Sequence, residues 1–150
     1  MNKAAVENQV KYLVEKRFPL YKKVLDGKKY EYGNEELQCS LCTMAKEEAL
    51  KNENDMCCNC VLSFSIWITC NDHDSLAGRI GLYDKNDSTY VEPWLKEMVT
   101  RCNIMLKKVE ARWECIYNPK TYEVSARCVS TKLSAVWDTK FGLYKGWLVL

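Results

Sequence analysis

Histidine is almost absent from this chain, since His73 is the only one among its 150 residues. A zinc-dependent deaminase needs a metal-binding histidine or cysteine followed closely by a catalytic glutamate, and an HNH nuclease needs more than one histidine. The six glycines form no phosphate-binding loop, and the sequence has neither a nucleophile elbow nor a Walker lysine. These absences predict that the chain is not an enzyme.

Long apolar runs are also missing. The longest one, residues 61–68, is interrupted by Ser63 and Ser65, whereas a membrane helix needs roughly 18 consecutive apolar residues. The first residues lack the uninterrupted apolar block of a signal peptide. We therefore expect a cytoplasmic protein without a membrane partner, and residues 1–150 fit a single globular domain by length and composition.

Cysteine, by contrast, is abundant: the chain has nine, and five of them fall between Cys39 and Cys60. Two pairs follow the pattern C-x2-C-x14-C-x2-C, which is typical of a structural zinc site with four thiolate ligands. An odd number of cysteines in a protein that is not exported argues against a disulfide framework. The pattern predicts one Zn²⁺, and no other cofactor, held by Cys39, Cys42, Cys57 and Cys60.

Three further residues leave alternatives open. Cys58 could replace Cys57 as a ligand, since the two are adjacent. Cys70 and His73 stand three positions apart and either replace one ligand, complete a second site, or are a buried thiol and a surface histidine.

The first half of the sequence predicts mainly helical structure. Residues 4–18 have apolar side chains at helical spacing, with Asn2 as N-cap. Pro19 either closes this helix or begins a second one that Gly27 ends. Between the cysteine pairs, residues 43–52 are strong helix formers, with Thr43 as the expected N-cap. Residues 29–33 and 61–69 are expected to be short strands.

The second half predicts a long helix and a small sheet. Helical spacing extends over residues 89–109, with Pro93 in the first turn. Alternating residues at 113–117 and 122–128, separated by a turn at 118–121, predict a β-hairpin, and further strands are expected at 133–137 and 140–150. The fold class is therefore α+β: a helical, zinc-stapled part (residues 1–75) and an antiparallel sheet packed on a long helix (residues 76–150).

Charge is distributed unevenly along the chain. Residues 36–75, which contain the cysteine pairs, carry two basic and seven acidic side chains. Phosphate binding requires the opposite sign, so we do not expect the metal region itself to bind nucleic acid. The basic helical faces at residues 11–29 and 96–112 keep a nucleic-acid partner as an alternative.

A longer pattern surrounds the cysteines. Residues 20–27 read Leu-Tyr-Lys-Lys-Val-Leu-Asp-Gly and are followed by Cys39-x-Leu41-Cys42, Cys57-x-x-Cys60 and the single Cys70. Over residues 18–110 this order resembles small accessory proteins encoded by tailed phages, although Val61 stands where a proline is usual and Cys58 is additional. The resemblance implies a viral origin and a metal-binding role for the four cysteines, and it implies no activity.

These observations favour a small interaction protein. We expect a zinc-binding, phage-encoded protein that binds and inhibits a host protein in the host cytoplasm, such as a transcription or antiviral-defence component. The first alternative is a nucleic-acid-binding zinc protein. The second is an enzyme or a small-ligand-binding protein with a site near Cys70 and His73.

Overall fold

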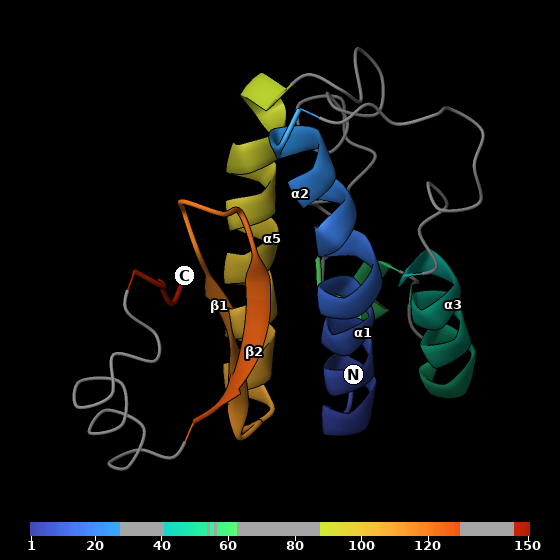
Figure 1. Ribbon diagram of the computed structural model, residues 1–150. Coiled ribbons are helices and arrows are strands. Elements are labelled where there is room, and N and C mark those ends of the chain that lie inside the picture. Colours follow the sequence, from blue (N-terminus) through green and yellow to red (C-terminus); the bar gives the residue numbers. More distant parts are fainter. Residues whose placement is uncertain (28–40, 54, 56, 63–87, 130–145) are drawn as a thin grey trace.

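The computed structural model describes residues 1–27, 41–53, 55, 57–62, 88–129 and 146–150. In chain order the elements are α1 (Lys3–Tyr12), the π-helical turn η1 (Leu13–Arg17), α2 (Phe18–Leu25), α3 (Leu41–Asn52), the 3₁₀ turn η3 (Cys57–Asn59), α5 (Ser88–Lys108), β1 (Trp113–Tyr117) and β2 (Val124–Cys128). The hairpin packs on α5 and also touches η1, while α1 and α2 pack beside α5, with α3 beyond α1 (Figure 1). The α+β class is confirmed, as is the sheet packed on the long helix.

The first two helices form one rod that contains a π-helical turn. Asn2 caps α1, because its Oδ1 accepts a hydrogen bond of 2.8 Å from the Ala5 N–H. The π turn comes immediately before α2, whose second residue is Pro19. Proline has no N–H, and its ring clashes with the carbonyl four residues earlier, so a local widening of the helix before Pro19 has a clear cause. Pro19 thus begins the second helix, and Gly27 with φ of +84° follows its end.

Helix α3 begins earlier in the chain than predicted. The helix begins at Leu41, two residues before the predicted start, so Thr43 lies inside it and is not its N-cap. Leu41 and Ala45 are one turn apart and are the buried residues of this helix. Burial of Leu41 therefore favours the additional residues at the start of the helix.

Helix α5 is the centre of the core. The predicted helix over residues 89–109 is confirmed within one residue at each end, but Pro93 is the sixth residue of α5 and lies in its second turn. The predicted apolar stripe is buried as well. The buried side chains of α5 are Val91, Trp94, Leu95, Met98, Val99, Cys102, Met105 and Leu106.

The predicted hairpin is confirmed, with Cys115 opposite Ala126 in an antiparallel register. In its turn the Asn118 side chain accepts hydrogen bonds from the N–H groups of Lys120 (3.0 Å) and Thr121 (3.4 Å), as asparagine commonly does in turns. On the other edge of β1, Tyr117 and Leu148 exchange two backbone hydrogen bonds of 2.8 and 2.7 Å. This bridge is the described part of the strand predicted at 140–150.

Several predicted elements lie outside the described residues. These are the strands at 29–33 and 133–137 and most of the strand at 61–69, whose first two residues form a turn. Among the described helices, none is long and apolar enough to cross a membrane.

Candidate metal centre and interaction groove

The structure describes part of the predicted ligand set. Cys42 lies exposed in the first turn of α3, and Cys60 directly follows η3 with 8% of its surface exposed. Cys57 is the first residue of η3, while Cys39, Cys70 and His73 lie outside the described residues. Within the described part of the chain, no three candidate ligands come together. The four-cysteine site therefore stays a prediction.

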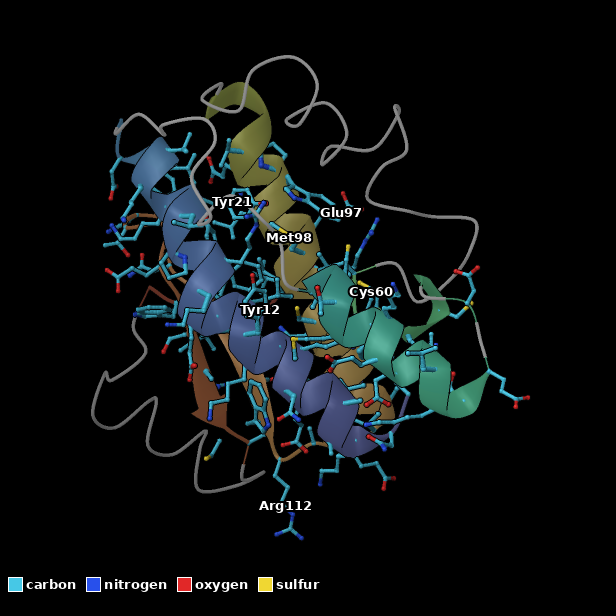
Figure 2. The ribbon with its side chains drawn as sticks, turned by 90° about the vertical axis from the view of Figure 1, so that its right-hand side faces the viewer. Tyr12, Tyr21, Cys60, Glu97, Met98 and Arg112 are labelled. Carbon is cyan, nitrogen blue, oxygen red and sulfur yellow. The ribbon has the colours of Figure 1, made fainter. Side chains whose placement is uncertain are left out.

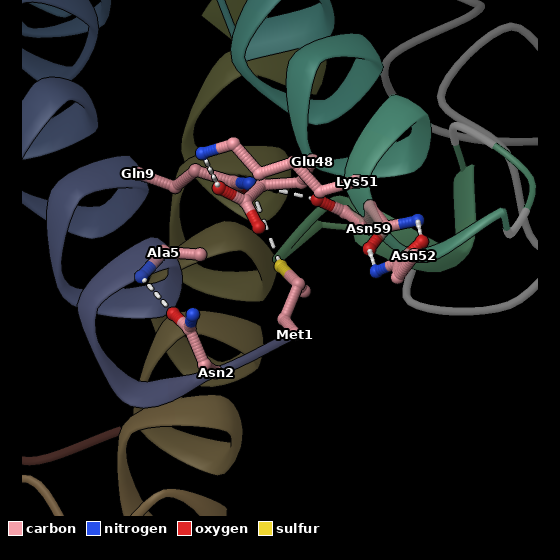
Figure 3. A network of polar contacts seen from close by, with 8 residues as sticks. All are labelled: Met1, Asn2, Ala5, Gln9, Glu48, Lys51, Asn52 and Asn59. Carbon is pink, nitrogen blue, oxygen red and sulfur yellow. Dashed lines mark hydrogen bonds and ion pairs between the residues drawn. The ribbon is translucent and has the colours of Figure 1, made fainter.

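The segment that bears the second cysteine pair is a tight turn packed against α3. The Cys58 N–H and the Asn59 side-chain amide both donate to the Asp55 carbonyl, at 3.1 and 2.9 Å. Asn59 also exchanges two hydrogen bonds with the side chain of Asn52, the last residue of α3, at 2.5 and 3.2 Å (Figure 3). The turn is thus joined to the end of α3 by side-chain amides.

A second amide joins the same turn to α1. Gln9 donates to the Asn59 carbonyl (2.7 Å) and accepts from the Val61 N–H (3.0 Å), so its side chain bonds the backbone on both sides of Cys60. Its remaining donor faces the sulfur of Met1 at 3.4 Å. Gln9 and Asn59 are each 1% exposed and are the two buried polar residues of the described chain.

The prediction of the site did not include Gln9. A signal was present, because Gln9 is a polar residue on the helix face formed by Val6, Val10 and Leu13. An amide on an apolar face must find partners, since a buried polar group without hydrogen bonds costs free energy. Which partners it finds could not be read from the pattern.

Cys60 also belongs to the buried core, together with Cys102 of α5 and Cys115 of β1; Figure 2 shows Cys60 beside α3. Burial raises the pKa of the Cys102 thiol well above its ordinary value, and the nearby Cys115 and Cys60 raise it further. Burial, with a smaller contribution from Glu114, raises the pKa of Cys115 to about 12. Both thiols therefore stay protonated at neutral pH, which disfavours them as nucleophiles or as metal ligands.

Two of the four proposed ligands, Cys42 and Cys60, have described side chains. Cys42 lies in α3 and Cys60 directly follows η3, and α3 and η3 are in contact. Zinc prefers sulfur ligands of this kind in structural sites.

An apolar groove lies between the second half of α5, the start of β1 and the C-terminal residues. Its volume is about 430 Å³. The apolar part of its lining includes Ile104, Leu106, Ala111, Trp113, Val129, Val149 and Leu150. Lys107 and Glu114 also line it, and Glu114 pairs with Arg127 at 2.9 Å.

Exposed apolar side chains gather at this groove. Five large apolar residues of the described chain are exposed, and three of them, Ile104, Val129 and Val149, line the groove. A fourth, Leu148, is adjacent to Val149, and only Leu50 of α3 lies elsewhere. Contiguous exposed apolar surface of this kind marks binding sites more often than isolated apolar residues do.

Asn103 of α5 holds the two walls of the groove together. Its side chain donates to the carbonyls of Cys115 (3.0 Å) and Leu150 (2.9 Å), and it accepts from the Cys115 N–H (2.8 Å). The antiparallel register of Tyr117 with Leu148 would place Leu150 opposite Cys115. The Asn103 amide therefore occupies the place of a strand neighbour and fixes the C-terminal residues beside β1.

No protein-family model, curated protein or solved structure matches this chain. Function must therefore be argued from the described side chains, and two places qualify: the cysteine-bearing turn and the apolar groove.

Proposed function

We propose that this chain is a zinc-stapled interaction protein that binds, and thereby inhibits, a protein of its host through the apolar groove. The gathering of exposed Ile104, Val129, Leu148 and Val149 at one place carries this proposal. In this proposal a single Zn²⁺ is held by Cys39, Cys42, Cys57 and Cys60. The phage origin rests on the order of the cysteine pairs.

The groove suits the apolar side chains of a protein partner. Burying Val149, which is 51% exposed, would contribute roughly 1 kcal/mol to binding, at about 25 cal/mol per Å² of apolar surface. Lys107 on the groove wall favours an acidic residue next to the apolar contacts, since the carboxylate of Glu114 already pairs with Arg127. Apolar contacts with a charged rim are the usual composition of protein interfaces.

The basic helical faces support a nucleic-acid partner less well. Lys22 pairs with Asp26 at 2.6 Å, Lys96 with Glu92 at 3.4 Å and Arg101 with Glu97 at 2.5 Å. Each acidic neighbour offsets part of the positive charge that phosphate binding would need. A protein partner is therefore the better-supported choice.

The zinc has a structural role in this proposal, because α3 needs more than its own packing. Two of its twelve residues are buried, and Leu50 is 76% exposed. Isolated helices of this length are marginally stable in water. A metal that joins the cysteine pair at the start of α3 to the pair that follows its end would hold α3 on the core.

The test compares three substitutions of exposed apolar residues by aspartate. Val149→Asp and Ile104→Asp place a charge in the groove, whereas Leu50→Asp makes the same change on α3. Tagged proteins, first shown by circular dichroism to be folded, are used to capture partners from host lysate, and captured proteins are quantified by mass spectrometry. We expect one protein whose recovery falls about tenfold with both groove variants, equivalent to about 1.4 kcal/mol, and stays unchanged with Leu50→Asp.

Equal recovery with all three variants would contradict the groove as the binding site. Elemental analysis of the same wild-type preparation tests the staple independently, with one zinc per chain as the expected result. A zinc content that is unchanged by Cys42→Ser would contradict the ligand assignment.

A further inference from the structure

Two side-chain amides in this structure bond the backbone next to a cysteine, and they serve as a natural comparison. Gln9 of α1 spans the carbonyl of Asn59 and the N–H of Val61, and so encloses Cys60. Asn103 of α5 bonds the N–H and the carbonyl of Cys115. Cys60 belongs to the proposed metal site, whereas Cys115 lies in β1 and belongs to the core.

We propose that Gln9 is a positioning residue for the metal site, because its amide fixes the backbone on both sides of Cys60 before metal binds. This inference rests on the proposed zinc site. Its geometric basis is the pair of hydrogen bonds, 2.7 Å to the Asn59 carbonyl and 3.0 Å from the Val61 N–H, which connect α1 to a segment about fifty positions later.

Packing alone does not explain an amide at this position. Gln9 lies on the apolar face of α1 and is 1% exposed, where a leucine or methionine would be buried without any need for partners. The amide, however, can satisfy a carbonyl and an N–H at once, and both of its donors and its acceptor are used. Its effect is therefore directional: it sets where residues 59–61 lie relative to α1.

The same hydrogen bonds continue to α3. Asn59, whose carbonyl accepts from Gln9, also exchanges two side-chain hydrogen bonds with Asn52 at the end of α3 (Figure 3). Gln9, Asn59 and Asn52 thus connect α1, the cysteine-bearing turn and α3 in one chain of amides. A ligand turn held in this way loses less conformational freedom when it binds metal, and that raises its affinity.

Groups that orient metal ligands without touching the metal typically change metal affinity by about 10- to 100-fold when they are removed. We expect Gln9→Leu, which keeps an apolar side chain of similar length, to raise the zinc dissociation constant by about this factor. Gln9→Met, which has nearly the length of glutamine and also lacks the amide, should cause a similar loss of affinity.

The experiment measures two quantities on the full chain: the zinc dissociation constant, by competition with a chromophoric chelator, and the urea midpoint of the metal-free protein. Asn103→Leu is the matched control, since it removes an amide that bonds a cysteine backbone away from the ligand cysteines. We expect Asn103→Leu to lower the urea midpoint and to leave the zinc dissociation constant within about twofold of wild type, because the ligand turn is untouched.

The outcomes separate the two proposals. If wild-type protein binds no zinc, the zinc site is wrong and the role of Gln9 falls with it. If wild type binds zinc and both Gln9 variants bind it equally tightly, the zinc site stands and the role of Gln9 is wrong. An equal loss of affinity in Asn103→Leu would show a general effect of stability and would also overturn it. Should Gln9→Leu fail to fold, the same comparison is made with Gln9→Met.

Discussion

Two parts of this molecule are held in place by different forces. The first part, which we call the body, consists of α1, α2, α5 and the hairpin, and most of its buried contacts are apolar: α5 alone buries eight side chains. The second part, the α3 unit, consists of α3 and η3 (Leu41–Asn52 and Cys57–Asn59). Two side chains of α3, Leu41 and Ala45, are buried in the core. The hydrogen bonds between Asn52 and Asn59 join α3 to η3, and the bond from Gln9 to the Asn59 carbonyl joins the unit to α1.

The difference shows which kind of contact stabilises each part of the molecule. Buried apolar surface gives the body a large, non-directional stabilisation that depends on its total area. Hydrogen bonds between amides contribute about 1 kcal/mol each on a net basis, and they fix geometry more than they add stability. The α3 unit is therefore well positioned but weakly held, which is the condition in which a bound metal has most to contribute.

Removing the proposed zinc should break this contrast most strongly. We expect a chelator to increase amide hydrogen exchange across α3 (Leu41–Asn52) by about 100-fold or more, because metal binding and local folding are coupled. Exchange in α5 should change by less than about threefold, since none of the four proposed ligands lies in α5. Hydrogen exchange followed by mass spectrometry, with and without chelator, measures both segments in one experiment.

Two results of that experiment would contradict the comparison. Unchanged exchange in α3 after zinc removal would show that amides and burial suffice for it. Equal increases in α3 and α5 would show that the body and the α3 unit unfold together.

A substitution in the body should have the next largest effect. Leu95 of α5 is fully buried and belongs to the core cluster, so Leu95→Ala should lower the free energy of unfolding by about 2–5 kcal/mol. Leu50→Ala is the matched change on α3, where the side chain is 76% exposed, and its effect should stay within about 0.5 kcal/mol. Urea unfolding followed by tryptophan fluorescence measures both values, and similar losses for the two variants would refute the assigned burial.

The same division explains what the sequence could predict. In the body, hydrophobic periodicity and turn residues are local properties of the sequence. The apolar residues at helical spacing from Trp94 to Leu106 predicted α5, and the alternating residues on either side of Asn118 predicted the hairpin. Asn2 and Gly27 were correctly expected at the two ends of the first helical rod. Such features depend on neighbours within a few positions, which a sequence shows directly.

Features that depend on contacts between distant residues could not be predicted from the sequence. Thr43 has the chemistry of an N-cap, yet the burial of Leu41 extends the helix past it. The partners of Gln9 lie about fifty positions away, and those of Asn103 include Leu150. The groove unites residues from α5, β1, the end of β2 and the C-terminus, so no single segment carries its signal. The cysteine spacing gave the candidate ligands, and only their chemical analysis can test them.

The buried thiols sharpen the comparison through pH, with a smaller effect. The pKa of Cys115 rises from 9.0 to about 12 on burial, with a further contribution from Glu114. In the folded protein the thiol keeps the proton that the unfolded chain releases near its ordinary pKa. Its contribution to stability is therefore complete below pH 9 and is lost as the pH rises from 9 toward 12.

Between these limits the free energy of unfolding should fall by up to about 1.4 kcal/mol per pH unit for this thiol. Cys102 and Tyr117, whose pKa values are raised mainly by burial as well, should add to the fall. Cys115→Ala should make the free energy of unfolding fall less steeply with pH, because one titrating thiol is removed. Cys128→Ala, at an exposed position, should leave this slope unchanged. Urea unfolding at about pH 8.0, 9.5 and 11.0 (about one and a half units apart, enough to resolve one proton) measures the slope. An identical slope in all three proteins would mean that Cys115 is as accessible to water as Cys128, and the body would then lack the dry core on which its contrast with the α3 unit depends.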